Sequence, residues 1–269
     1  MKPSASRGIT RPTGWRPPSN TASETGLARL AKPMKHSLFG AAALGGLLLG
    51  LWFGTVGCQT PTSSSQGLAL FNGRDLAGWT HVLEDPTVSR ETVWSVRDGI
   101  LICQGKPTGY LRTTNRFTNF RLFVEYRWAP GKEPSNSGIL TRIQPPDRPL
   151  PRCIEVQLRH GSAGDVLGLQ GMRVAEGQPR FFEARGNPVA GDISGVRKLM
   201  DAENPPGEWN LVEILARDDV YTVWVNGKLV NEARGVTRAA GPIGLQSEGG
   251  EIHFRQVRLV PLPSRIEVR

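Results

Sequence analysis

The stretch RCIEVQLRHGSAGD, Arg152–Asp165, alternates strictly between apolar and polar residues from Cys153 onward. Successive side chains of a strand face opposite sides of a sheet, so this pattern predicts a strand with one buried face. The apolar side carries Ile154, Val156 and Leu158, and the polar side carries Glu155, Gln157 and Arg159. The polar side either faces solvent or forms part of a site.

Similar alternation recurs along the chain and predicts strands within residues 93–105, 119–128, 137–144, 208–232 and 241–262. Asp98-Gly99 and Asn226-Gly227 are dipeptides that favour two-residue hairpin turns. No amphipathic helix stands out. The chain is therefore predicted to be all-β, as a sandwich or a barrel.

Residues 171–207 do not fit this pattern, because Gly, Pro and charged residues dominate them. A loop of this length is uncommon in a compact domain and is often functional. We expect it either to form a wall over one face of a sheet or to be a partly disordered excursion.

The N-terminal region, residues 1–57, is predicted to be an extension followed by a lipoprotein signal peptide. Met34 begins a basic start, and Leu38–Val56 carries no charge. The run ends in small residues before Cys58, as in a bacterial lipoprotein signal, where this Cys would be acylated. Met34 is then a candidate for the true start. An uncleaved membrane anchor is the alternative.

Residues 58–66 form a polar linker, and residues 67–264 form the predicted domain. Either form of the N-terminal region places this domain outside the cytoplasm and tethers it to a membrane. Cys103 and Cys153 could pair in an oxidising compartment or remain as buried thiols.

The charge is distributed unevenly. Residues 1–57 hold seven of the 33 Lys and Arg residues but one of the 24 Asp and Glu residues. The remainder therefore carries about +3 of the formal +9, and no basic run contains interleaved aromatic residues. These features exclude nucleic acid as an expected partner.

The motifs LALFNGRDLAGWT, NSGILTR, IEVQL, GEWNLVEI, VNGKLV and GPIGLQSEGGEIHFRQVRL follow one another in order. This set resembles the bacterial family once called domain of unknown function 1080. The family is now named for 3-keto-disaccharide hydrolase, or 3-keto-glucoside 1,2-lyase and 3-keto-2-hydroxy-glucal hydratase, activity. The resemblance covers residues 68–262. It implies a concanavalin A-like antiparallel β-sandwich, or jelly roll, that binds carbohydrate on a concave sheet.

That resemblance implies cleavage of 3-keto-glycosides by proton abstraction at C2, elimination at C1 and addition of water. The reaction needs a base, a cation or donor for the enolate oxygen, and an acid for the leaving group. A divalent metal such as Ca²⁺ could fill the second role, although no Cys/His cluster suggests a metal site.

Three residues are candidates for catalysis. Glu155 lies in the EVQ motif and is the candidate base, unless it is merely a solvated carboxylate. Glu125 has the corresponding parity on its own strand and is the second carboxylate, as acid or metal ligand; a surface ion pair is the alternative. Arg142 follows the NSG turn and could hold the enolate oxygen, or it could be a paired surface arginine.

Five further residues are candidates for substrate binding: Gln157, Arg159, Asn136, Gln246 and Glu248. Asn136 could instead be a turn former, and Gln246 an amide on an edge strand. Many relatives carry His-Gly where this chain has Ser247-Glu248-Gly249, and many carry Asp near Arg159 and His160. These departures leave two further functions open, a non-catalytic carbohydrate-binding lipoprotein and an interaction module of a surface complex.

Overall fold

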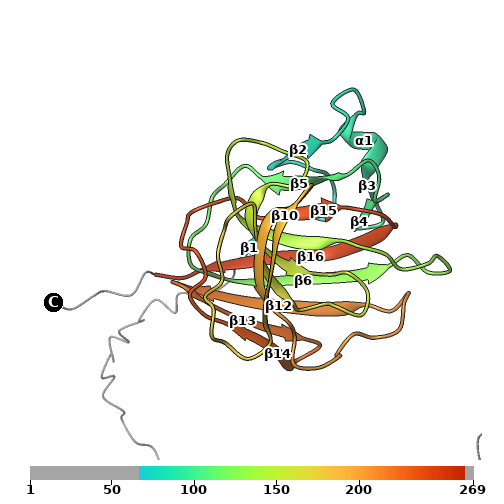
Figure 1. The fold of residues 1–269 in the computed structure, drawn as a ribbon. Helices are drawn as coiled ribbons and strands as arrows, with labels where there is room; N and C mark the ends of the chain where they lie inside the picture. The colour runs from blue at the N-terminus through green and yellow to red at the C-terminus, as the bar shows by residue number, and fades with distance from the viewer. Residues whose placement is uncertain (1–66, 264–269) are drawn as a thin grey trace, which may run out of the picture. The chain divides into compact units, whose positions relative to one another are not determined.

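The computed structural model describes residues 67–263, and the predicted signal, Cys58 and most of the linker lie outside them. Two eight-stranded antiparallel sheets pack face to face (Figure 1). Within these residues no helix is long and apolar enough to cross a membrane. The helix that is assigned, α1 (Arg90–Val93), has four residues.

We call the first sheet the back sheet. Its strands, in spatial order, are β14 (Lys228–Ala233), β13 (Val220–Val225), β12 (Asn210–Arg217), β6 (Phe120–Trp128), β16 (Ile252–Pro261), β4 (Ile100–Cys103) and β3 (Trp94–Arg97). The short strand β1 (Leu68–Ala69) also pairs with β16.

We call the second sheet the front sheet. Its strands, in spatial order, are β10 (Phe181–Asn187), β11 (Gly191–Val196), β9 (Val166–Leu169), β8 (Arg152–Gln157), β7 (Gly138–Gln144), β15 (Gly244–Ser247), β5 (Gly109–Thr113) and β2 (Trp79–Leu83).

The main core lies between the sheets and follows from the alternation in the sequence. The apolar face of β8 points into it through Ile154 and Val156, followed by Leu158 just after the strand, and the back sheet contributes residues such as Leu122 and Val124. Burial of such side chains contributes about 25 cal/mol per Å² of apolar surface. The two predicted hairpin turns are confirmed, because Asp98-Gly99 joins β3 to β4 and Asn226-Gly227 joins β13 to β14 with positive φ angles.

A second apolar cluster covers the opposite face of the front sheet. It contains Tyr110, Leu140 and Ile143, with Leu150 and Ile193 packed against it. Loops therefore cover part of this face, and polar side chains on it need not be solvated. Cys103 and Cys153 are both buried with free thiols, so they do not form the disulfide that was one of two expectations.

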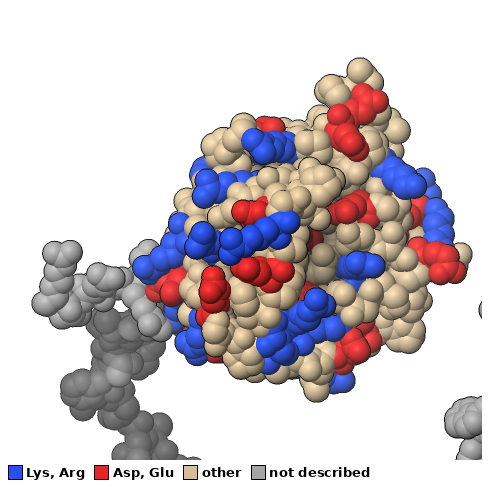
Figure 2. Space-filling view, in the orientation of Figure 1, with Lys and Arg blue, Asp and Glu red and all other residues tan. Residues whose placement is uncertain are grey.

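Residues 171–207 are more ordered than their composition indicates. They contain the hairpin of β10 and β11, which extends the front sheet by pairing with β9. Most β10 side chains are exposed, so this strand lacks the apolar signal of the others. Figure 2 shows Lys and Arg interspersed with Asp and Glu over the visible face, and neither sign dominates it.

Candidate functional site

Glu155 lies in β8, on the face of the front sheet that points away from the back sheet. Its neighbours along the strand, Ile154 and Val156, belong to the core between the sheets. Glu155 is only 4% exposed. The alternation therefore assigned the correct face to this side chain, but the face is covered rather than solvated.

The neighbouring strand β7 leaves space for this carboxyl group. Gly138 pairs with Gln157, and a Cβ atom on Gly138 would lie 2.1 Å from Glu155 Oε1. Real Cβ atoms do not approach an oxygen so closely. The Glu155 carboxyl therefore occupies the space that any other residue at position 138 would fill.

The next two strands bring further polar groups to the same face. Gln246 on β15 pairs with Tyr110 on β5, while the adjacent Leu245 points into the main core. Glu248 follows the end of β15 and forms a bridge with Asn136. Residues far apart in the sequence thus converge near Glu155.

The two carboxyl groups influence each other. Burial and the nearby Glu248 charge raise the pKa of Glu155 from 4.5 to about 8. Burial also raises the pKa of Glu248, although a side-chain contact with Asn136 and the charge of Arg159 favour its ionised form. The two carboxyl groups therefore titrate as a coupled pair, and Glu155 keeps its proton to a higher pH than an ordinary carboxyl group.

Besides the hydroxyl of Tyr110, three buried carboxyl or amide oxygen atoms of this area lack a hydrogen-bond partner within residues 67–263. They are Asn136 Oδ1, Glu155 Oε1 and Gln246 Oε1. A buried acceptor without a partner typically costs about 1–3 kcal/mol. Their concentration in one place indicates a site for a ligand that donates hydrogen bonds or carries positive charge.

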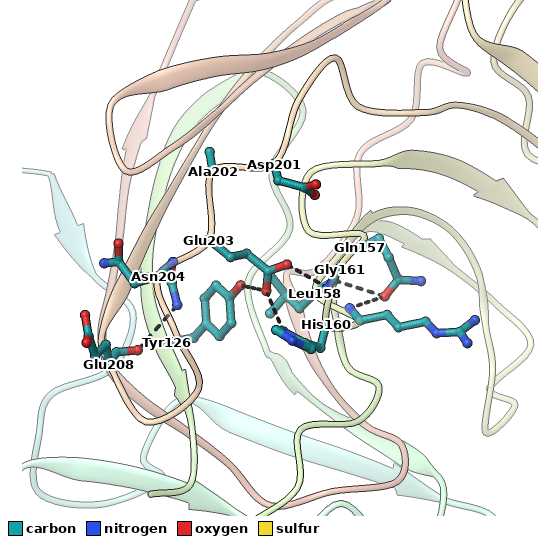
Figure 3. A network of polar contacts seen from close by, with 12 residues as sticks. Tyr126, Gln157, Leu158, His160, Gly161, Asp201, Ala202, Glu203, Asn204 and Glu208 are labelled. Atoms are coloured by element: carbon teal, nitrogen blue, oxygen red, sulfur yellow. Dashed lines mark hydrogen bonds and ion pairs between the residues drawn. The ribbon is translucent and has the colours of Figure 1, made fainter. Parts of the chain in front are cut away.

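The end of β8 is held in a defined conformation. Gln157 Oε1 accepts hydrogen bonds from the next two backbone NH groups, at 3.0 and 2.8 Å (Figure 3). Glu203 anchors the following loop by accepting hydrogen bonds from the Tyr126 hydroxyl at 3.0 Å and the Gly161 NH at 2.8 Å. The loop that carries the exposed Arg159 is therefore fixed where its charge acts on Glu248.

A pocket of about 550 Å³ adjoins Glu248. Pro149 and Leu150 line it from the connection between β7 and β8, and Pro188 and Val189 line it from the β10–β11 turn. Residues 171–207 therefore supply part of a wall over the front sheet. This is the first of the two arrangements expected for them, rather than a disordered excursion. A second cavity of about 450 Å³ lies beside β10 and contains none of the predicted site residues.

The predicted convergence of Glu125 with Glu155 is wrong. Glu125 lies on β6, in the back sheet, and forms an ion pair with Arg255. Alternation along a strand shows which face a residue takes, but it does not show which sheet the strand joins. Glu125 therefore forms a surface ion pair, which was the alternative expectation for it.

The predicted place of Arg142 in the site is also wrong. The pairing of β7 with β8 shifts register after Thr141, and Arg142 has a φ of 53°. Its side chain is fully buried and donates hydrogen bonds of 2.6 Å to the carbonyl oxygens of Thr237 and Asp218. The bulge turns this guanidinium away from Glu155 and toward Tyr221 of the back sheet.

Two contributors to the site were absent from the sequence prediction. Tyr110 lies on β5, a strand of the front sheet that the sequence analysis did not predict, and burial raises the pKa of its hydroxyl to about 12. The sequence predicts Gly138 at the junction of the NSG turn with the strand within residues 137–144 and assigns it no place in the site. The signal available for Tyr110 was the short run GYLRT, which is rich in strand-forming residues.

The donor set contains only oxygen. Among the described residues no group of three or more His, Cys, Asp and Glu side chains could hold a metal ion. Glu155 and Glu248, with the amide oxygens of Asn136 and Gln246, are nevertheless ligands of the type that Ca²⁺ and Mg²⁺ accept. The partnerless Asn136, Glu155 and Gln246 oxygens fit such a cation chemically.

Comparisons with known proteins agree on the fold. The model of the 3-keto-alpha-glucoside-1,2-lyase-like domain matches residues 68–260, whereas no curated protein matches the chain. A Parabacteroides distasonis ATCC 8503 protein named as a glycosyl hydrolase is 22% identical with a TM-score of 0.52, over 72% of this chain and 93% of that one. The carbohydrate-binding module CBM66 from Bacillus subtilis is 12% identical with a TM-score of 0.48, over 68% and 95%.

A third structure is LamA from Zobellia galactanivorans with laminaritriose and laminaritetraose. It is 13% identical with a TM-score of 0.46, over 69% of this chain and 92% of that one. The expectation of an all-β concanavalin A-like sandwich is confirmed. Because the family match extends over residues 68–260, well over half of the chain, the protein belongs to the 3-keto-alpha-glucoside-1,2-lyase-like family.

Proposed function

We propose that this protein cleaves 3-keto-glycosides at the front sheet, with Glu155 as the base that removes the C2 proton. The observation that carries the proposal is a buried carboxyl group whose pKa is raised to about 8 beside a second carboxyl, Glu248. A base with such a pKa is stronger than an ordinary carboxylate and still ionises near neutral pH. Family membership supports the substrate class.

The reaction would begin at the carbon next to the ketone. Ionised Glu155 takes the C2 proton, and the electron pair of the C–H bond moves toward the C3 carbonyl oxygen as an enolate. Arg159 is the cation proposed to stabilise that oxygen, a role in which the buried Arg142 cannot serve.

Elimination follows. The enolate electrons return to form the C1–C2 double bond as the C1–O bond breaks, and the departing oxygen takes up a proton, which Glu155 can return. Addition of water to the resulting 2-hydroxy-3-keto-glucal then gives the free 3-keto sugar, so the net change is hydrolysis.

A divalent cation held by Glu248, Asn136 and Gln246, which leaves Glu155 free as the base, would supply positive charge for the enolate oxygen when bound. The protein oxygens would orient it. Without it, Gln246 and Asn136 are proposed to accept hydrogen bonds from sugar hydroxyls, since their oxygens lack partners within the described chain.

The test uses residues 67–269 with 3-keto-trehalose and 3-keto-sucrose, with and without chelator. We expect release of the 3-keto sugar by the wild type and a loss of at least about a hundredfold in kcat/KM for E155Q. E125Q is the matched carboxylate control and should keep wild-type activity.

A non-catalytic carbohydrate-binding protein is the second candidate, because the same three acceptor oxygens would bind hydroxyls without any reaction. Unchanged substrate under all conditions, together with calorimetric binding of trehalose that E155Q weakens, would establish this function instead.

We propose further that the domain works outside the cytoplasm, tethered through a lipid on Cys58. The charge-free run Leu38–Val56 before this cysteine supports the proposal. Metabolic labelling with palmitate should mark the wild type but not C58A, and labelling of C58A would contradict it.

A further inference from the structure

Strand β10 forms an open edge of the front sheet. It pairs with β11 on one side, and among residues 67–263 no strand pairs with its other side. Its residues from Glu183 to Asn187 are exposed. An open edge presents backbone NH and carbonyl groups that can pair with another extended chain.

The backbone groups of alternate residues point out of this edge. The NH group of Arg197 donates a hydrogen bond of 3.1 Å to the Arg180 carbonyl, so the backbone of Arg180 is bonded toward the β11 side. Hydrogen-bonded pairs alternate along an antiparallel ladder, and the register of β10 with β11 is regular as far as Ala184. The same alternation directs the backbone groups of Glu183 and Arg185 away from β11.

The two residues whose backbone points outward carry opposite charges. Glu183 and Arg185 flank Ala184, and their side chains form an ion pair at 3.4 Å, with exposed fractions of 44% and 76%. An ion pair that is so exposed contributes little to the stability of a single chain. Both charges are therefore available to a partner at this edge.

The charges select one register in which two copies of β10 can pair antiparallel. A two-fold axis at Ala184 places Glu183 of each copy opposite Arg185 of the other copy. An axis at Glu183 would bring two glutamates together, and an axis at Arg185 would bring two arginines together. Opposite charges across a strand pair stabilise it, and like charges destabilise it. The edge is therefore complementary to itself in the register centred on Ala184.

The same four residues, Glu-Ala-Arg-Gly, recur at 232–235, but their backbone is already paired. There the NH group of Arg234 donates to Gln178 Oε1 at 2.7 Å, and its carbonyl accepts a hydrogen bond of 3.1 Å from the Ala175 NH. Glu232 and Arg234 form an ion pair like that of β10. The two copies of the motif thus differ in whether another segment covers them.

We propose that two copies of this protein associate through β10, in the register centred on Ala184, and join their front sheets into one continuous sheet. The backbone groups of Glu183 and Arg185 would form the central hydrogen bonds, and their side chains two symmetric ion pairs. This contact goes beyond the proposed function and does not depend on it. The β10–β11 hairpin also carries the turn that lines the pocket beside Glu248, so association would support one wall of that pocket.

Sedimentation velocity of residues 67–269, which contain both sheets and the core between them, measures the association. We expect the wild type to pass from monomer to dimer as its concentration rises into the millimolar range. E183R and R185E should each raise the dissociation constant at least about tenfold, because each places like charges opposite one another. A wild type that stays monomeric throughout this range would overturn the proposal.

The double variant and a mixture of the single variants test the register. E183R/R185E exchanges both charges and should restore the dissociation constant to within about threefold of the wild-type value. An equimolar mixture of E183R and R185E should form a heterodimer, because the arginines of one copy then face the glutamates of the other. Failure of both rescues would overturn the contact and would leave this edge to another register or to an extended segment of another protein.

E232R is the matched control, because it makes the same charge reversal in the same four-residue motif at the covered position. It changes the net charge of the chain as E183R does, yet it should leave the dissociation constant nearly unchanged. A rise in E232R equal to that in E183R would show that net charge alone governs association, and it would overturn the contact through β10.

Discussion

Glu155 and Gly138 share one space on the front sheet, because a Cβ atom at position 138 would lie 2.1 Å from Glu155 Oε1. The position of the carboxyl group thus depends on the absence of a side chain on the neighbouring strand. Gly138 does not have a positive φ, so its backbone conformation is open to alanine. A single methyl group at position 138 would therefore displace the carboxyl group of Glu155.

The first prediction concerns this pair. G138A should displace the carboxyl group and lower kcat/KM on 3-keto-trehalose at least about tenfold, since misplacement by about 1 Å can cost a hundredfold. A double-mutant cycle with E155Q separates displacement from unfolding. G138A should add little to the loss in E155Q, and fully additive losses would show that Gly138 acts independently of Glu155.

The second prediction concerns the pH dependence of turnover. If ionised Glu155 is the base, kcat/KM should rise with pH and level off above about 8, because the carboxyl must lose its proton first. E125Q should show the same profile as the wild type. A fall in kcat/KM above pH 8 would instead make protonated Glu155 the acid and Glu248 the base.

The third prediction concerns stability. The folded pKa of Glu155 is raised from 4.5 to about 8, so between these values the folded state holds a proton that the unfolded state has lost. The free energy of unfolding should therefore fall as pH rises through this window, by an amount on the order of several kcal/mol at most.

Urea unfolding of the wild type and E155Q at pH 5, 7 and 9 measures this effect. The glutamine does not titrate, so E155Q should lose less stability between pH 5 and 9. Burial of Glu248 raises the pKa of that carboxyl too, so E248Q should flatten the profile in the same direction. Parallel profiles for the wild type and E155Q would contradict the buried, protonated state.

The fourth prediction concerns Arg142. R142M would remove the donor for the carbonyl oxygens of Thr237 and Asp218 and should destabilise the protein by about 3–5 kcal/mol. The folded fraction should keep its kcat, because the guanidinium of Arg142 takes no part in the proposed reaction. R142K should be intermediate in stability. Normal stability with lost turnover would return Arg142 to the active site.

Several local features were predictable because they depend on neighbouring residues alone. The Asp98-Gly99 and Asn226-Gly227 turns require positive φ, and few residues other than these types adopt it easily. The alternation in β8 likewise fixed Ile154 and Val156 in the core and Glu155 on the other face. Both kinds of signal are read within a few residues of chain.

Other features could not be predicted, because they depend on which strands meet. Glu125 and Glu155 have equivalent parity but lie in different sheets. A register shift after Thr141 reversed the expected direction of Arg142. β10 forms although its side chains are mostly exposed, since pairing with β11 satisfies its backbone on one side.

The sequence by itself determined that this chain is all-β and that Glu155 points away from the core, because strand periodicity and turn chemistry are local properties; the choice of a sandwich over a barrel came from the family resemblance. Tertiary structure decided that Glu155 is covered, that Glu248 rather than Glu125 is its companion, and that Gly138 makes room for it. These outcomes depend on sheet order, on register and on the loops that close over the front sheet. The pKa of Glu155 is raised for the same reason, since desolvation depends on what covers a carboxyl group and not on its neighbours in the chain.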